Sequence, residues 1–212
     1  MYNDITAAIL SGGKSTRMGE NKSFLKIGGR TVIERVGELL EPMFGKIILI
    51  TNEPGEYSFL NVEAFRDIYP FKGPLSGIHS ALRNSKTDRC FIISCDIPLM
   101  KREMIDYLVN YKTDKKITIA RAGGFIQQLC GVYHKGSITE AERILLAVNP
   151  AAEVRAPGQR ERRCSVLELV DRTGAEIINA EDLPFYTDEM YFNMNRKEEF
   201  EYVKSRLQIQ GG

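Results

Sequence analysis

The chain has 212 residues, in which 29 lysines and arginines are balanced by 28 aspartates and glutamates, for a formal net charge of +1. This balance argues against the strongly basic surface that nucleic-acid-binding proteins carry. Apolar residues make up 43% of the chain and charged residues 27%, which is the composition of a soluble globular protein and not of a disordered one. At about 100–200 residues per domain, the length favours one domain and leaves two open.

The sequence carries no signal for export or membrane insertion. The first ten residues lack a basic stretch followed by a long apolar core. The longest apolar runs, such as 47–50 and 90–95, are far shorter than the ~20 residues that span a bilayer. The four cysteines form no CxxC pair, and only His79 and His134 could join them in a zinc site, which the spacing disfavours. We therefore expect a cytoplasmic protein with buried, unpaired cysteines.

Short β-branched runs alternate with amphipathic helical patterns over the first 120 residues. Strands are predicted at 5–10, 46–51, 89–95 and 116–120, with a weaker one at 62–66. Helices are predicted between them, at 31–41, 75–84 and 102–111. Thr31 and Glu34 have the spacing of a capping box, and Pro74 stands at a favourable helix start.

This alternation predicts an α/β protein with a doubly wound, mostly parallel sheet, that is, a Rossmann-like three-layer architecture. Such sheets bind ligands at the carboxyl ends of their strands, so functional residues are expected in the loops that follow the strands.

The pattern changes after residue 121. Gly123 and Gly124 predict a turn before a strand at 125–133, and a helix at 137–148 begins with a Ser137–Glu140 capping box. An exposed loop at 149–159, a helix at 164–170, a strand at 175–179 and a charged helix at 196–207 complete the chain. We expect one domain, 1–212, in which the change of pattern separates two halves, 1–115 and 116–207.

A glycine-rich segment, SGGKSTRMG, directly follows the first strand. It is not a Walker A loop, because that motif requires a glycine where Ala8 stands within the strand. The backbone N–H groups of Gly12 and Gly13 can approach an anion closely, and Arg17 and Lys22 add positive charge. The segment predicts a phosphate site, with an ordinary glycine turn as the alternative.

Together with four later motifs, this segment resembles the molybdenum cofactor guanylyltransferase family, the MobA family of nucleotidyltransferases. The opening LxGGxSxRMGxxK pattern belongs to the whole superfamily. The later motifs are GPLSGI at 73–78, CDIPL at 95–99, LCGVY at 129–133 and NMN at 193–195. The resemblance extends from residue 5 to about 202, and GPLSGI is its most discriminating part, because cytidylyl-transferring relatives usually differ there.

The resemblance implies an enzyme that transfers GMP from GTP to molybdenum-loaded molybdopterin, forming the guanine dinucleotide cofactor and pyrophosphate. It implies that the nucleotide is bound by Leu10, Ser11, Gly12, Gly13, Lys22, Asn52, Asp67 and Gly73. The implied catalytic residues are Arg17, Lys22 and Asp96, and Asp96 is also the implied ligand of Mg²⁺. The implied acceptor-binding residues are Asn193, Asn195 and Arg163. The resemblance thus implies a nucleotide-binding half at 1–115 and an acceptor half at 116–207.

The chemistry of nucleotidyl transfer agrees with this small set of residues. The catalyst must position anions and neutralise the charge that develops on the leaving pyrophosphate. Magnesium typically takes one or two carboxylates together with substrate phosphates and water, so Asp96 alone can serve. The acceptor phosphate is itself the nucleophile, and the scarcity of histidine is therefore no obstacle.

Several of these residues also have an ordinary structural interpretation. Asp96 precedes the Ile-Pro of its motif and could be a turn or cap residue, and Asn193 and Asn195 could be turn formers. Asn52 could simply begin the Asn-Glu-Pro-Gly turn, and Arg163 could belong to a solvated basic face. The sequence departs from the family pattern at a few positions on the acceptor side, including the Arg-Lys pair that follows Asn195.

Two further functions stay open from the sequence. One is cytidylyl or other nucleotidyl transfer to molybdopterin or to a sugar or small-acid phosphate, and the other is a non-catalytic nucleotide-binding module. The presence of both Lys22 and Asp96 argues against the second. We expect a monomer or weak oligomer that binds GTP and molybdopterin and contacts other molybdenum-cofactor proteins, without nucleic-acid or membrane partners.

Overall fold

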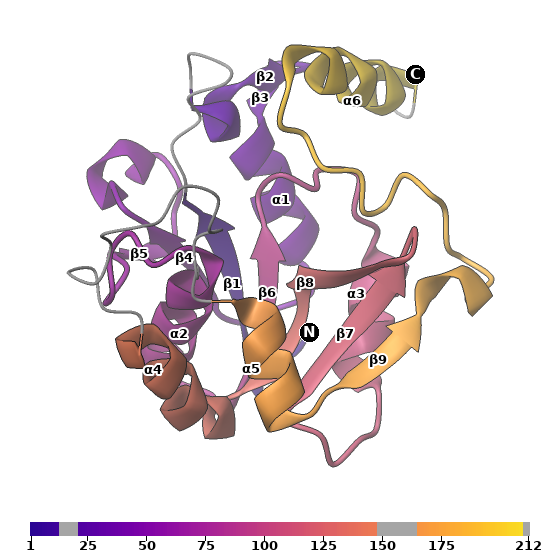
Figure 1. Ribbon diagram of the computed structural model, residues 1–212. Coiled ribbons are helices and arrows are strands. Elements are labelled where there is room, and N and C mark those ends of the chain that lie inside the picture. Colours follow the sequence, from indigo (N-terminus) through magenta and orange to yellow (C-terminus); the bar gives the residue numbers. More distant parts are fainter. Residues whose placement is uncertain (13–20, 148–164, 210–212) are drawn as a thin grey trace, which may run out of the picture.

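The computed structural model describes residues 1–12, 21–147 and 165–209 (Figure 1). Gly13, Arg17 and Arg163 of the expected site, and the loop predicted at 149–159, lie outside these residues. No helix of the described ranges is both long enough and apolar enough to cross a membrane.

A seven-stranded mixed sheet forms the centre of the molecule, in the order β5-β4-β1-β6-β8-β7-β9. Its strands are β1 (Ile5–Ser11), β4 (Ile47–Thr51), β5 (Glu63–Phe65), β6 (Arg89–Ser94), β7 (Ile117–Ala122), β8 (Phe125–His134) and β9 (Glu176–Asn179). The strands β5, β4, β1 and β6 run parallel, and β9 is parallel to β7. The predicted α/β class and mostly parallel sheet are confirmed.

One strand, β8, runs antiparallel to both of its neighbours, β6 and β7. The chain between β7 and β8 consists of Gly123 and Gly124 alone, with φ angles of 57° and 77°. A two-residue turn with positive φ at both positions closes a hairpin, whereas a parallel crossover needs a dozen or more residues. The predicted turn therefore also decides the strand direction.

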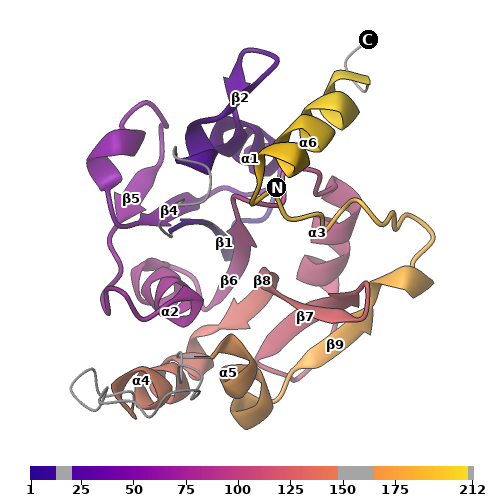
Figure 2. The ribbon, with the colours of Figure 1, turned by 45° about the horizontal axis from the view of Figure 1, so that its top comes forward.

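The helices cover both faces of this sheet in three layers (Figure 2). They are α1 (Val32–Leu40), α2 (Pro74–Asn84), α3 (Arg102–Asn110), α4 (Ile138–Ala147) and α5 (Val166–Thr173). Helices α1 and α3 share one core with Ile9 of β1, and α2, α4 and α5 share the other with Ala8 and Leu10. Alternating side chains of one buried strand thus enter two cores. The capping box of Thr31 and Glu34 at α1 is confirmed.

The capping box predicted for Ser137 and Glu140 is wrong. Ser137 ends a short 3-10 helix, η3 (Lys135–Ser137), which His134 caps by accepting a hydrogen bond from the Gly136 N–H at its Nδ1, 2.9 Å away. The buried Ser137 hydroxyl has no hydrogen-bond partner within the described part of the chain. The 3-10 turn moves the helix start past Ser137, so this hydroxyl does not reach the free N–H groups of α4.

The carboxyl-terminal helix α6 (Lys197–Ile209) returns to the first half of the chain. It packs on the small hairpin of β2 (Lys26–Ile27) and β3 (Arg30–Thr31), next to which it lies in both views (Figures 1 and 2). Ile27, Met194 and Val203 are among the buried residues of this third cluster. Because α6 packs there, the segment before it crosses the carboxyl edge of the sheet, that is, the edge at which the strands β1, β4 and β6 end. The described residues also form the 3-10 helices η1 (Lys22–Phe24), η2 (Pro54–Tyr57) and η5 (Ala180–Asp182).

Candidate active site

The strands β1, β4 and β6 end side by side at one edge of the sheet. Ser11, at the end of β1, is the register partner of Thr51 at the end of β4, and Leu10 is the partner of Ser94 at the end of β6. A cavity of about 220 Å³ opens at this edge. Its lining comprises Ser11, Gly12, Asn21, Lys22, Thr51, Asn52, Glu53, Glu56, Tyr57, Phe71 and Cys95. This is the edge at which parallel α/β sheets bind their ligands.

Three residues that are far apart in sequence meet beside this cavity. The ammonium nitrogen of Lys22 lies 2.8 Å from Asp96 Oδ2 and 2.9 Å from Asn195 Oδ1, and it donates a hydrogen bond to each. The side chains of Lys22 and Asp96 are only 18% and 16% exposed. Two backbone hydrogen bonds hold these segments together. The Met194 N–H donates to the Asp96 carbonyl, and the Cys95 N–H donates to the Leu10 carbonyl at the end of β1.

The hydrogen bond that the Asp96 side chain accepts comes from Lys22 and not from the backbone of its own turn. A capping aspartate instead accepts from N–H groups one to three residues onward. Asn195 likewise accepts from Lys22, while its own N–H donates to the Glu199 carboxylate at the start of α6. Asn193 differs, since its amide donates to the Tyr191 carbonyl two residues back, in a local turn contact.

The other residues expected at the nucleotide divide into two groups. Ser11, Gly12 and Asn52 line the cavity together with Lys22. Leu10 and Asp67 instead face Gly77 of α2. This glycine has no side chain, and a Cβ added to it would lie only 3.4 Å from Leu10 Cδ1 and 3.9 Å from Asp67 Oδ1.

Gly73, which is exposed, precedes α2 with a φ of 76°, in the left-handed region that favours glycine.

The carboxylate of Asp67 has one oxygen without a hydrogen-bond partner in the described part of the chain. Its buried Oδ1 has no hydrogen-bond partner among the residues that the structure describes. Burial raises the pKa of this carboxyl group to about 6, because desolvation disfavours the charged form. A ligand that offers an N–H or O–H donor would satisfy it.

Two residues of this edge were not predicted from the sequence as functional. Tyr57 is buried at the end of η2 and bonds to Ser11 and Ser23. Cys95 lines the cavity, and burial raises the pKa of its thiol to about 11, so it stays protonated at neutral pH. Tyr57 follows a proline-glycine turn without any periodic pattern, and only the folded chain reveals its neighbours.

A second hollow, of about 700 Å³, opens where β7 ends and β8 begins. Asn193 lines it together with Arg121, Gln128, Tyr186 and Phe192. It belongs to the same edge of the sheet as the Lys22–Asp96 pair, because β8 runs antiparallel to β6 and starts where β6 ends.

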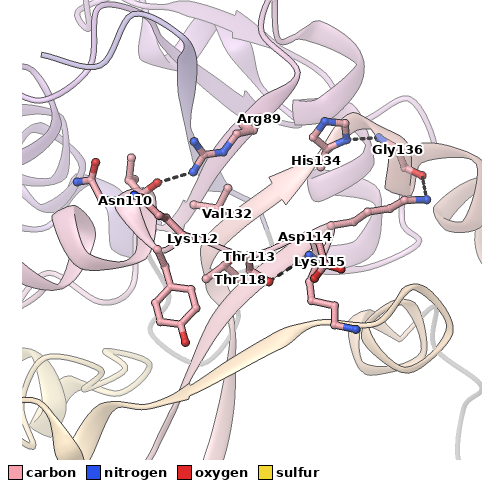
Figure 3. A pocket seen from close by; sticks show the side chains of 13 residues that line it. Arg89, Asn110, Lys112, Thr113, Asp114, Lys115, Thr118, Val132, His134 and Gly136 are labelled. Atoms are coloured by element: carbon pink, nitrogen blue, oxygen red, sulfur yellow. Dashed lines mark hydrogen bonds between the residues drawn. The ribbon is translucent and has the colours of Figure 1, made fainter.

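A third hollow, of about 660 Å³, lies at the opposite edge, where β6 and β7 begin (Figure 3). Its lining includes the cations Arg89, Lys112, Lys115 and Lys116 beside Asp114, and Arg89 and Lys116 bond to backbone carbonyls of the protein itself. Arg89 donates to the Val109 carbonyl and Lys116 to the Gly136 carbonyl. This hollow is separated from Asp96 by the full length of the strands.

Comparison with known proteins identifies the family. The model of the MobA-like NTP transferase domain matches residues 7–161, which is more than half of the chain. The chain belongs to this family. The match begins in β1 and includes the glycine-rich segment, Asn52, Asp67 and Asp96.

Similar proteins cover most of the chain of this MobA-like NTP transferase. A probable molybdenum cofactor guanylyltransferase of Clostridium perfringens is 44% identical over 142 residues, which are 66% of this chain and 71% of the relative. One of Carboxydothermus hydrogenoformans, with the same name, is 32% identical over 93% of this chain and 94% of the relative. The crystal structure of molybdopterin-guanine dinucleotide biosynthesis protein A from Archaeoglobus fulgidus matches with a TM-score of 0.77 at 22% identity, covering 96% and 98% of the two chains. This last likeness shows a common fold.

Proposed function

We propose that this MobA-like transferase moves GMP from GTP to molybdenum-loaded molybdopterin, releasing pyrophosphate. The names of its relatives from Clostridium and Carboxydothermus support the choice of substrates. The observation that carries the proposal is the convergence of Lys22, Asp96 and Asn195 beside the cavity at the carboxyl edge of the sheet. A fixed cation next to a carboxylate is what a reaction on a triphosphate requires, since the main task is to position anions and neutralise developing charge.

The order of the strands supports one orientation of the nucleotide. Asp96 follows β6 and binds the Lys22 ammonium group, whereas Asn52 follows β4, two strand spacings or about 10 Å further along the edge. We place the phosphates at Lys22, with Gly12, Gly13 and Arg17 as further phosphate contacts. The base and ribose then lie toward Asn52, and Asp67, whose buried Oδ1 next to α2 has no partner among the described residues, is a further candidate acceptor for their N–H or O–H groups.

In this proposal a magnesium ion binds between protein and substrate, with oxygens of both as its ligands. The described residues hold no group of three or more histidines, cysteines, aspartates or glutamates that could bind a metal alone. The oxygens of Asp96 and Asn195 do converge on one cation, the Lys22 ammonium, and carboxylate and amide oxygens suit Mg²⁺. When bound, the metal would neutralise phosphate charge, with Asp96 as its protein ligand. Lys22 orients the triphosphate and balances charge on the leaving pyrophosphate.

The acceptor belongs, in this proposal, to the second half of the chain, 116–207. The hollow of about 700 Å³ next to Asn193 offers Arg121 for an anionic group and the aromatic side chains of Tyr186 and Phe192 for a flat ring. Asn195 joins this half to Lys22, and Arg163 would add positive charge. The acceptor phosphate attacks the α-phosphorus of GTP as the nucleophile, so no general base is required.

Release of pyrophosphate tests the proposal directly. The protein is incubated with molybdopterin, Mg²⁺ and either GTP, CTP or ATP, and Lys22→Met, in which we expect a strongly reduced but measurable rate, serves as the control. We expect turnover with GTP well above that with the other two. Faster turnover with CTP would assign cytidylyl transfer, and tight nucleotide binding without any pyrophosphate release would identify a non-catalytic module.

A further inference from the structure

The hydroxyl group of Tyr57 bonds to three side chains beside the nucleotide cavity. Its oxygen lies 2.8 Å from Ser11 Oγ, 2.9 Å from Ser23 Oγ and 3.1 Å from Asn21 Nδ2. Tyr57 is 3% exposed, so water hardly competes for these bonds. A phenol has one O–H donor and two acceptor lone pairs, and three partners use this capacity completely.

The donors and acceptors of this network can be assigned in only one direction. Ser23 donates its hydroxyl proton to Asn21 Oδ1 at 2.7 Å, and its oxygen must therefore accept from Tyr57. The Asn21 amide donates to Tyr57, which leaves the second lone pair of Tyr57 to accept from Ser11. Ser11 in turn accepts from the Cys95 thiol at 3.6 Å. The Cys95 thiol thus donates to Ser11, Ser11 to Tyr57, Tyr57 to Ser23, and Ser23 to the Asn21 side-chain oxygen. Each of the three hydroxyl groups donates one hydrogen bond.

This chain of hydrogen bonds connects the two ends of the catalytic ion pair. Cys95 immediately precedes Asp96, and Asn21 and Ser23 flank Lys22 on both sides. The 2.8 Å bond from Lys22 to Asp96 closes the path into a ring. Hydrogen bonds in such a buried series polarise one another, so the loss of one member weakens the rest.

The turn that carries Lys22 needs this support. It is a 3-10 helix of three residues, Lys22–Phe24, with backbone bonds of 3.0 Å from the Phe24 N–H and 3.3 Å from the Leu25 N–H. So short a 3-10 segment has little stability of its own. Lysine adds a flexible four-carbon stem, so its ammonium group is placed only as well as the turn beneath it.

We propose that Tyr57 is a positioning residue for nucleotidyl transfer: its hydroxyl orders the turn of Lys22 and so sets the Lys22 ammonium beside Asp96. The inference rests on the proposed function, because it concerns the same ion pair. Tyr57 acts through Lys22, and its removal should therefore matter only while Lys22 is present. Positioning of this kind is catalytically sensitive, since an error of about 1 Å can cost on the order of 100-fold in rate.

The test is a double-mutant cycle with Tyr57→Phe, which removes only the hydroxyl group. We expect Tyr57→Phe to lower kcat/KM for GTP roughly tenfold, the size of a lost buried hydrogen bond. In a Lys22→Met background the same change should have no further effect. Tyr2→Phe is the matched control, since the Tyr2 hydroxyl also bonds to a side chain, Asp106, yet lies at the other edge of the sheet.

Amide hydrogen exchange at residues 23–25 is the second measurement, and it requires no turnover. Exchange there should accelerate in Tyr57→Phe and stay unchanged in Tyr2→Phe. Unaltered exchange, unaltered kcat/KM, or an equal loss with and without Lys22 would each overturn the inference. A parent protein that transfers no GMP would refute the proposed function instead, and the exchange measurement would still decide whether the hydroxyl orders the turn.

Discussion

Replacing Asp96 by asparagine separates a catalytic carboxylate from a structural one. The substitution keeps the size of the side chain and an oxygen that can accept from Lys22, but it removes the negative charge. The two side chains of the pair are 18% and 16% exposed, which lies between a surface pair and a buried one. We expect the free energy of unfolding to fall by about 1 kcal/mol. For a chain of this length, that corresponds to a melting temperature lower by about 2–4 °C.

The effect on the reaction should be far larger than the effect on stability. A neutral amide binds a divalent cation weakly and cannot balance the Lys22 ammonium, so turnover should fall by about 100- to 1000-fold. The Mg²⁺ concentration at half-maximal rate should rise as well. The assay is the initial rate of pyrophosphate release from GTP across a magnesium series, with a thermal melt of each protein.

Asp106→Asn is the matched control, because its carboxylate accepts from Tyr2 at the far edge of the sheet. It should keep the rate and magnesium dependence of the parent. Turnover of Asp96→Asn close to that of the parent at limiting magnesium would remove this carboxylate from the mechanism. A melting temperature lowered by more than about 10 °C would show instead that Asp96 mainly supports the fold.

Three further predictions test the cavity, the buried carboxylate and the sheet. The chain contains no tryptophan, so Phe71→Trp would place a single tryptophan in the cavity wall. GTP should change the tryptophan emission of this variant, whereas the emission of Ile177→Trp, on the edge strand β9, should not respond. Asp67→Asn should raise the melting temperature at pH 8 and much less at pH 4. The pKa of Asp67 in the folded protein, about 6, lies above its ordinary value, so the parent protein is stabilised at low pH and loses that stability as the pH rises toward 6. An equal gain at both pH values would contradict this reasoning. Gly131→Ala should lower the free energy of unfolding, measured by urea titration, by about 2–3 kcal/mol, because the new Cβ would lie 2.5 Å from a backbone oxygen of β7. Gly37→Ala is the control: its Cβ would enter open space on α1, so this change should be neutral or stabilising.

Much of the fold could be predicted because its signals are local. Continuous apolar runs marked β1, β4 and β6 to within a residue or two, and the Thr31–Glu34 pair marked the start of α1. The Ser137–Glu140 pair has the same spacing and failed, because the chain enters α4 through a 3-10 turn capped by His134. A capping motif depends on the backbone before it, which the spacing alone does not describe.

The sequence by itself determined the α/β class, the strands that end in functional loops, and the residue types that bind phosphate and metal. These follow from periodicity and from the chemistry of single side chains, both of which are readable along the chain. Only the tertiary structure decided which of those residues meet. Lys22 and Asn195 are 173 positions apart, and they meet because α6 packs on the β2–β3 hairpin. Tyr57 acquires its partners only when η1, η2 and the end of β1 come together, since contacts between distant segments arise from packing and leave no period in the sequence.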